Sequence, residues 1–250
     1  MKKLFSLLLI MFPLMASAQG VNLNTEGQDS AYVQSIVGRS QKIVDKLEIK
    51  DEATALSVRN IIANRYFLLN DIYKVRDAKK KAAKDAYTGK AKDLMIEDAE
   101  KECSAELYKH HFEFESALSC YLPAEKVEAV KDGMTYNVVK VTYDATLDMI
   151  PTLKEEEKVQ ILAWLKEARE FAMDAENSNK KHGWFGKYKG RINNYLSKRD
   201  EQIAKLEELC KEMNSDIESL QALISALQKS DTVTSVTPII IDGVEVGYTM

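Results

Sequence analysis

The residues with the clearest chemical character form a basic, aromatic segment in the second half of the chain. Between positions 177 and 199 the sequence has seven Lys or Arg residues and no Asp or Glu. Three of the ten glycines and one of the two tryptophans also lie there. The residue types suit carbohydrate binding, and the candidate binding residues are His182, Trp184, Phe185, Lys187, Tyr188, Lys189, Arg191, Asn193, Asn194 and Tyr195.

Each residue type in this segment has a role in such a site. Flat aromatic rings stack on the apolar face of a sugar, and Asn side chains donate to and accept from hydroxyl groups. Arg and Lys pair with the carboxylates of uronic acids. Glycines allow close approach of the backbone. The alternative is a loop between helices, whose aromatic side chains fill the core and whose cations lie near a helix C-terminus.

The sequence offers no comparable signal for catalysis or for a metal. His110 and His111 are adjacent, so on a helix they point about 100° apart and do not share a metal ion easily. Pairing over four residues would instead join Glu106 to His110, or His111 to Glu115. Zinc, phosphate-loop, dinucleotide and nucleophile-elbow motifs are absent from the sequence. We therefore predict no cofactor, no metal and no identifiable catalytic residue.

Three cysteines follow the N-terminal region: Cys103, Cys120 and Cys210. Cys103 and Cys120 are 17 residues apart in one helical pattern, which would separate them by about 25 Å, too far for a disulfide. We interpret both as small buried side chains.

The composition and the N-terminus indicate export. Lys2 and Lys3 precede an apolar core, and Ala16-Ser17-Ala18 is a small-residue cleavage box, so residues 1–18 read as a signal peptide and the mature chain begins at Gln19. No Cys follows the box, so a lipid anchor is not expected, and no second apolar run predicts a membrane span. The expected location is the periplasm or the medium.

The formal net charge of the whole chain is -4. A mildly acidic chain is a poor candidate for general nucleic-acid binding.

Hydrophobic periodicity predicts an all-α fold, a multi-helix bundle. Asp29 and Ser30 begin the first helix, and residues 48–51 break the chain before the second. A third pattern runs from about 91 to 121 and includes Leu94, Met95 and Phe112. Further helices follow Pro123, where Gly133 is expected to interrupt, and span 154–176. Residues 135–143 favour a strand by propensity, but their apolar spacing fits one helical face, and we choose helix.

The C-terminal part carries a heptad pattern and a hairpin signal. Apolar residues from Ile203 to Leu227 recur at alternating steps of three and four, which predicts a coiled-coil helix over 198–230. Self-association through 203–227 is expected, and folding back on the bundle is the alternative. Cys210 lies on this seam, where a parallel pair would bring two thiols together. An Asp-Gly turn in 231–250 predicts a β-hairpin tail that belongs to a truncated module.

An ordered series of segments resembles a known family. The segments are 132–136 (Asp-Gly-Met-Thr-Tyr), 161–170, 172–174 and 181–196, with weaker similarity at 70–72 and 76–77. Together they resemble a secreted bacterial family of unknown function that is described as sugar-binding and accompanies polysaccharide-utilisation genes. The resemblance covers about 28–197, so the predicted sugar-binding domain is 19–197. It implies a glycan context and carries no catalytic residue.

A second resemblance concerns the end of the chain. Leu209-Cys-Lys-Glu-Met-Asn, residues 233–238 and Gly247-Tyr248-Thr249 are similar to an uncharacterised module of surface glycan-utilisation proteins, which normally continues beyond this point.

These observations lead to one prediction and two alternatives. The prediction is an exported, non-enzymatic protein that binds a glycan, and acidic glycans suit the basic segment. The first alternative is a structural or chaperone-like helical adaptor for a protein partner, in which Trp184 and Phe185 are buried. The second is a carbohydrate-active enzyme such as a lyase, which needs Tyr, His or carboxylate groups gathered in one cleft.

Overall fold

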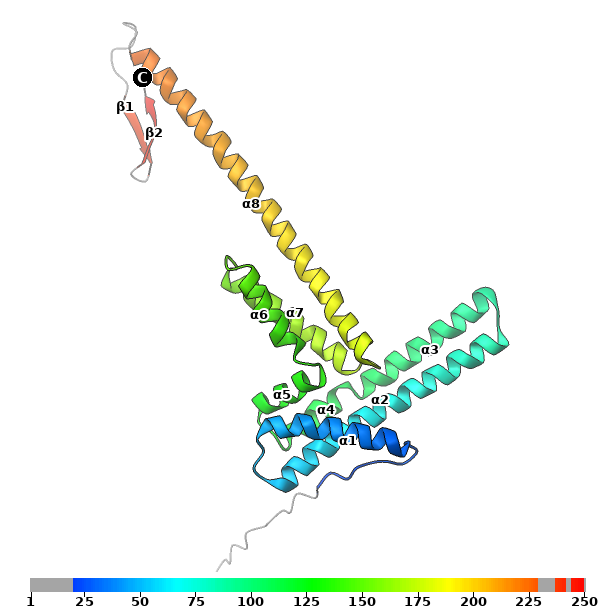
Figure 1. Ribbon diagram of the computed structural model, residues 1–250. Helices are drawn as coiled ribbons and strands as arrows, with labels where there is room; N and C mark the ends of the chain where they lie inside the picture. The colour runs from blue at the N-terminus through cyan, green and yellow to red at the C-terminus, as the bar shows by residue number, and fades with distance from the viewer. Residues whose placement is uncertain (1–19, 229–236, 242–243, 250) are drawn as a thin grey trace, which may run out of the picture. The chain divides into compact units, whose positions relative to one another are not determined.

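The computed structural model describes residues 20–228, 237–241 and 244–249 (Figure 1). The predicted signal peptide and its cleavage site lie outside these residues. The chain forms two compact units, Met1–Tyr188 and Lys189–Met250.

The first unit is entirely helical in its described part, which confirms the predicted all-α bundle. Its elements are α1 (Ser30–Val44), the 3-10 helix η1 (Asp45–Leu47), α2 (Glu52–Ala86), α3 (Gly89–Lys109), α4 (His111–Ser119), α5 (Ala124–Met134), α6 (Val138–Met149), α7 (Glu155–Met173) and the first turns of α8, which runs Ser178–Gln228.

The first two helices begin where their caps predict. The Asp29 carboxylate accepts from the backbone N–H of Tyr32, and the Asp51 carboxylate accepts from that of Thr54. Between the two helices Glu48 takes a left-handed conformation with φ of 51° and ends η1. The predicted break at 48–51 is therefore confirmed.

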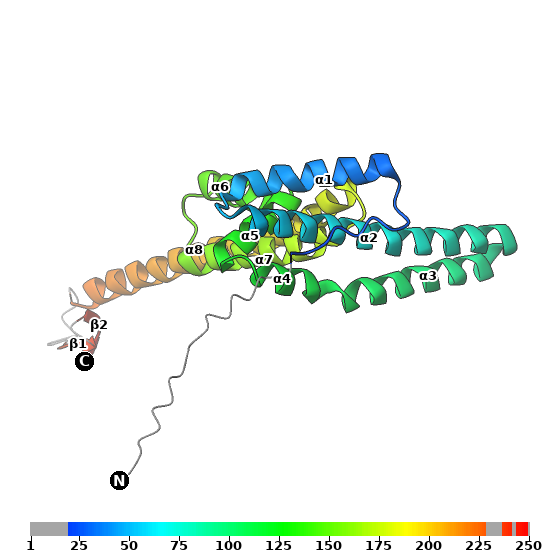
Figure 2. The ribbon, with the colours of Figure 1, turned by 90° about the horizontal axis from the view of Figure 1, so that it is seen from below.

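The main core lies among α1, α2, α4 and α5. Its fully buried side chains include Val58, Ile62, Leu118, Val130 and Met134. Helices α2 and α3 form a long antiparallel hairpin, and both views show them side by side (Figures 1 and 2). This hairpin and α4 carry one wall of the site described below.

The third predicted helix is two helices, because the chain breaks at His110 between α3 and α4. The Arg65 guanidinium donates to the His110 carbonyl oxygen at 2.8 Å and so satisfies a backbone acceptor at the break. The apolar pattern over 91–121 also predicted the wrong buried residues, since Leu94, Met95 and Phe112 are exposed. The break turns Phe112 to the surface and leaves Phe114 and Leu118 in the core.

The ambiguous stretch 135–143 is helical from Val138 onward, as predicted, and it forms no strand. Tyr136 and Asn137 adopt left-handed conformations and separate α5 from α6. Gly133 does not interrupt a helix, because α5 continues to Met134. A Cβ at Gly133 would lie 3.0 Å from the Ile43 Cγ2, so the glycine lets α5 approach α1 closely.

The basic aromatic segment is helical, because α8 runs without a break from Ser178 to Gln228. The alternative of a loop between helices is therefore wrong about the loop, but its expectation that aromatic side chains fill the core is confirmed for Phe185 and Tyr188. The predicted domain boundary at 197 also falls inside this single helix.

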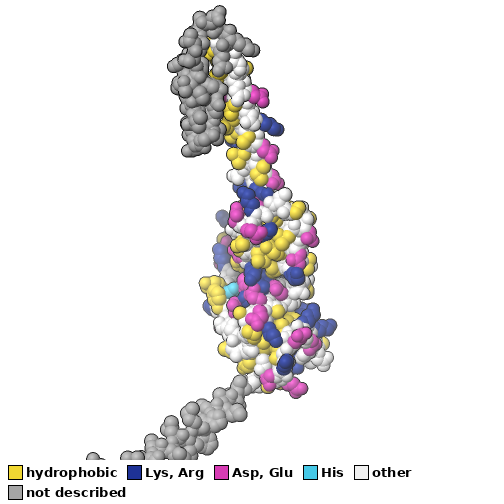
Figure 3. Space-filling model, turned by 90° about the vertical axis from the view of Figure 1, so that its left-hand side faces the viewer, with side chains coloured by type: hydrophobic (Ala, Val, Ile, Leu, Met, Phe, Trp, Pro, Cys, Tyr) yellow, Lys and Arg dark blue, Asp and Glu magenta, His cyan; other side chains and the backbone are white. Residues whose placement is uncertain are grey.

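In the second unit α8 continues from Lys189 and carries hydrophobic side chains along its length (Figure 3). Most of the heptad residues are exposed, namely Ile203, Leu206, Cys210, Met213, Ile217, Leu220 and Leu227. Strands β1 (Thr237–Ile241) and β2 (Val244–Thr249) pair antiparallel. The predicted Asp242-Gly243 turn lies outside the described residues, so the hairpin module stays a prediction.

Candidate functional site

A groove of about 670 Å³ opens on the first unit. Its walls come from the second half of α2, the second half of α3, the start of α4, the end of α7 and the start of α8. This volume lies in the range typical of sites for small ligands. The lining is mainly apolar, with five aromatic side chains: Tyr73, Tyr108, Phe112, Phe171 and Trp184.

Two aromatic pairs shape the groove. Phe171 of α7 and Trp184 of α8 stack with ring centroids 4.6 Å apart and planes 17° apart. Tyr108 and Phe112 meet edge to face with centroids 6.1 Å apart. Tyr108 and Phe112 are 70% and 63% exposed, so these two rings have open faces. Exposed flat rings on a groove wall can stack on a ligand.

Charged side chains lie between the rings. The Arg76 guanidinium pairs with Glu176 at 2.9 Å, and the Lys80 ammonium pairs with Glu100. Lys180 also lines the groove, and its ammonium forms no ion pair with any described residue. The groove therefore presents one cation that is not neutralised by a described carboxylate.

A histidine and an aspartate meet at the groove wall. The His111 Nδ1 lies 2.7 Å from the Asp174 Oδ2, and the Arg65 guanidinium donates to the Asp174 Oδ1 at 2.5 Å. The Tyr73 hydroxyl donates to the Asp174 backbone oxygen at 2.7 Å, and burial raises the Tyr73 pKa. Asp174 ends α7 as its C-cap, so these contacts tie α2 and α4 to the end of α7.

This pairing differs from one of the two histidine pairs suggested by spacing. Glu106 and His110 do meet, with the His110 Nε2 3.4 Å from the Glu106 Oε1. His111 does not pair with Glu115, because Glu115 instead accepts from the buried Lys131. No group of three His, Cys, Asp or Glu side chains among the described residues is placed to hold a metal ion.

Cys103 also lines the groove, and it is buried as predicted. Burial raises the pKa of its thiol, which makes it a poor nucleophile. The same interpretation is wrong for Cys120, which is exposed beyond the end of α4.

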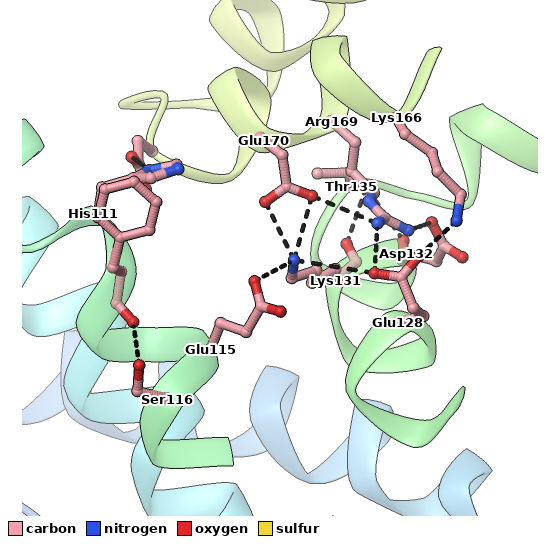
Figure 4. A network of polar contacts seen from close by, with 12 residues as sticks. His111, Glu115, Ser116, Glu128, Lys131, Asp132, Thr135, Lys166, Arg169 and Glu170 are labelled. Atoms are coloured by element: carbon pink, nitrogen blue, oxygen red, sulfur yellow. Dashed lines mark hydrogen bonds and ion pairs between the residues drawn. The ribbon is translucent and has the colours of Figure 1, made fainter. Parts of the chain in front are cut away.

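A charged network fixes the helices behind the site (Figure 4). Arg169 of α7 donates to Asp132 at 2.7 Å and to Glu128 at 2.8 Å, both on α5. Lys131 of α5 donates to Glu115 of α4 at 2.7 Å and to Glu170 of α7. Both cations are almost completely buried. The network therefore holds α4 and α7, the helices that carry His111 and Phe171, at fixed positions on α5.

Comparison with known protein families gives a match over most of the chain. The model of the family described as "Protein of unknown function (DUF3826)" matches residues 33–215. The chain belongs to this family. No curated protein matches the chain. The DUF3826 match begins before α2 and ends within α8, so it includes every residue named as lining the groove. It also extends beyond 197, the predicted end of the sugar-binding domain.

The structure separates the predicted binding residues of this DUF3826 chain into groups. Trp184 is the only one of them that lines the groove. Phe185 and Tyr188 are buried, with 2% and 6% exposure, so neither ring is open to a sugar; this part of the prediction is corrected. Helical spacing explains the difference, since 181, 185 and 188 share the inward face.

The other predicted residues lie elsewhere on α8. His182 stacks on Tyr136 with centroids 5.4 Å apart, and the Lys187 ammonium lies 5.0 Å from the centroid of the Trp184 ring. The remaining five belong to the second unit, where Lys189, Arg191, Asn193 and Asn194 are exposed and Tyr195 is half-buried. The segment is thus not one site.

Sequence reasoning missed most of the groove. Tyr108 and Phe171 had no assigned role, Lys180 was counted in the basic segment but not among the candidate binding residues, and Phe112 was placed in the apolar pattern of the third predicted helix. A signal existed at positions 108–112, where two aromatic residues four apart flank the His pair. Nothing in the sequence pairs His111 with Asp174, 63 residues away.

Proposed function

We propose that the groove of this DUF3826 protein binds a carbohydrate, and specifically a glycan that carries carboxylate groups. The supporting observation is that two open aromatic rings, Tyr108 and Phe112, and the unpaired ammonium of Lys180 line one groove. The rings would stack on sugar faces, and Lys180 would pair with a uronate. Trp184 would stack on Phe171 and hold that ring in the groove wall.

We further propose that the protein acts after export, in the periplasm or outside the cell, as the N-terminal segment predicts. No helix among the described residues has the length and apolar character needed to cross a membrane. A protein that works on extracellular glycans would need such a location.

We also propose that copies of the chain associate through 203–227. The exposed apolar side chains along this part of α8 form a surface that favours protein contact. The adaptor interpretation also requires a surface of this kind. Paired chains would carry two grooves, and two sites on one polymer increase the apparent affinity.

Titration calorimetry on the chain from Gln19 to Met250 tests the glycan proposal. The panel contains neutral and uronic-acid oligosaccharides of matched length. We expect dissociation constants between about 1 mM and 1 µM for the acidic set, and weaker binding of the neutral set.

Variants then locate the site. Phe112→Ala is expected to weaken binding about tenfold, and Lys180→Gln is expected to weaken binding of acidic oligosaccharides only. Tyr87→Ala and Lys140→Gln remove an exposed ring and an exposed ammonium outside the groove, and should leave affinity unchanged. Equal losses in the groove variants and these controls, or binding that survives Phe112→Ala, would contradict the proposal.

A further inference from the structure

The His111 ring is oriented by two side chains from other parts of the fold, Asp174 directly and Arg65 through Asp174. Asp174, in the connection from α7 to α8, holds the Nδ1 at 2.7 Å, and Arg65 of α2 holds the other Asp174 oxygen. The second Arg65 nitrogen bonds the His110 carbonyl next to His111. The Arg65 side chain is buried. A histidine fixed in this way has a defined orientation and tautomer.

The remaining ring nitrogen is available for chemistry. With a proton on Nδ1 directed at the carboxylate, the Nε2 of neutral imidazole has a free lone pair. Among the described residues the His111 Nε2 makes no hydrogen bond or ion pair, and His111 lines the groove. A carboxylate on the far nitrogen stabilises the imidazolium that forms when the ring accepts a proton. This is the arrangement of a general base.

The other groups in the groove narrow the reaction class. Glycoside hydrolysis requires a carboxylic acid that donates a proton, but Glu100, Asp174 and Glu176 are all paired with cations. The Ser104 hydroxyl donates to the Glu100 backbone oxygen, and burial raises the pKa of the Cys103 thiol, so neither is an activated nucleophile. A histidine base and an unpaired ammonium in one groove suit removal of a proton from the carbon beside a carboxylate.

We propose that the groove carries out β-elimination on uronate-containing glycans, with His111 as the catalytic base. The inference rests on the proposed function, because Lys180 must pair with the uronate carboxylate. That pairing stabilises the negative charge that develops when the proton beside the carboxylate is removed.

The step balances without a further reactant. The His111 Nε2 takes the C5 proton, and the electron pair of the C5–H bond forms the C4–C5 double bond. The C4–O bond to the neighbouring sugar breaks, and the leaving oxygen receives the proton back from the imidazolium. The products are an unsaturated uronate at one new end and a free hydroxyl at the other. Asp174 and Arg65 act as positioning residues.

The test uses the chain from Gln19 to Met250 with oligouronides that represent both configurations at C5. Product formation is followed by the ultraviolet absorbance of the C4–C5 double bond and by mass spectrometry, and binding is measured on the same samples. We expect unsaturated products from at least one substrate. His111→Asn keeps a donor for Asp174 and removes the base, so turnover should fall at least about 100-fold while binding changes little.

His182→Asn is the matched control, because His182 stacks on Tyr136 and does not line the groove. It should retain turnover. For the positioning role, Asp174→Asn should lower kcat with little change in KM, and circular dichroism must show that this variant is folded. If Asp174→Asn raised KM and left kcat unchanged, Asp174 would have a purely structural role.

Each result separates the two proposals. Binding without any product, saturated products, or turnover that survives His111→Asn would overturn the elimination and leave the glycan-binding groove standing. Absence of binding and of product across the panel would overturn both.

Discussion

Arg169 of α7 donates to the Glu128 carboxylate of α5 at 2.8 Å, from a position where its own side chain is almost fully enclosed (Figure 4). Burial raises the pKa of Glu128, but hydrogen bonds from Arg169 and Lys166 outweigh it and lower that pKa to about 2. The Arg169 Nε has no partner among the described residues, so its charge depends on Glu128, Asp132 and Glu170.

Glu128→Gln should therefore destabilise the protein. Removing the charge leaves a buried guanidinium with fewer partners, and we expect a loss of about 1–3 kcal/mol in the free energy of unfolding at neutral pH. Glu155→Gln breaks an exposed pair with Lys158 and should change stability by less than about 0.5 kcal/mol. Urea denaturation of both variants measures the difference.

The pH dependence of this effect has a defined sign. A carboxylate whose pKa is lower in the folded protein than in the unfolded chain stabilises the fold at pH values above its pKa in the unfolded chain, which is about 4.5 for Glu128. That stabilisation decreases as the pH falls through about 2. The cost of Glu128→Gln should thus shrink between pH 5 and pH 2.5 in the range where both proteins are folded. A cost that stays constant would show that the charge of Glu128 is not involved.

Lys181 should give the free energy of unfolding a second pH dependence, at alkaline pH. Its ammonium donates to the Met134 carbonyl oxygen at 2.9 Å and lies 5.3 Å from the centroid of the Tyr66 ring. Burial, followed by the charge of Arg39, lowers its pKa from 10.5 to about 8. Between these values the unfolded chain binds the extra proton, so native stability rises with pH relative to a variant without the amine.

Lys181→Met should remove this dependence. From pH 8 to pH 10 the wild type should gain stability over the variant, with a slope of at most about 1.4 kcal/mol per pH unit. Lys84→Met, at an exposed position, should run parallel to the wild type. If wild type and Lys181→Met also run parallel, the amine does not titrate in this window. Chemical denaturation at several pH values supplies the data.

Substitution of two helical glycines by alanine tests whether the lack of a side chain matters for packing. A Cβ at Gly186 of α8 would meet no atom within 4 Å, so Gly186→Ala should stabilise the helix by about 0.5–1 kcal/mol. Gly133→Ala places its Cβ 3.0 Å from the core residue Ile43 and should cost about 1–2 kcal/mol. Thermal unfolding compares them, and a stabilising Gly133→Ala would mean that α5 can move away from α1.

The heptad seam predicts a parallel pair of chains. Ile occupies three of the four positions that alternate with Leu and Met, a pattern that favours parallel dimers. Ile217→Asp should shift the chain to monomers in sedimentation equilibrium, whereas Ser215→Asp, off the seam, should not. Both residues are exposed on α8.

Cysteine cross-linking reports the orientation of that pair. Oxidised glutathione should join two chains through Cys210, giving a species of doubled mass on a non-reducing gel. Cys210→Ser should abolish it, and Cys120→Ser should not, although Cys120 is exposed as well. A cross-link that depends on Cys120 instead would contradict the parallel seam.

Local signals explain which elements could be predicted. The side-chain caps at Asp29 and Asp51 act within three residues, so the helix starts follow from the sequence. The choice of helix over strand near Val138 was also correct, although the apolar face used to predict it is largely exposed at Val141 and Met149, and the helix buries Val139 and Thr146 instead. The single helix over 91–121 was wrong, because the Arg65 side chain that bonds the His110 carbonyl at the break comes from a distant helix.

In the candidate site, too, some residues could be predicted from the local sequence and others depend on contacts between distant segments. Trp184 could be selected from the concentration of aromatic and basic residues around it. Phe185 and Tyr188 were selected for the same reason, yet they face the core, because composition does not say which side of a helix is covered. The pairing of His111 with Asp174 and the stacking of Phe171 on Trp184 join residues from different helices.

The sequence by itself determined the all-α class, the starts of the first two helices and the heptad pattern of α8, since these depend on periodicity and on contacts within a few residues. Only the tertiary structure decided that the groove lies against Tyr108, Phe112 and Lys180, and that the basic aromatic segment is mostly a helix face. The physical reason is that a groove is formed by the packing of separate helices. Their relative placement depends on long-range contacts such as the Arg169–Glu128 pair.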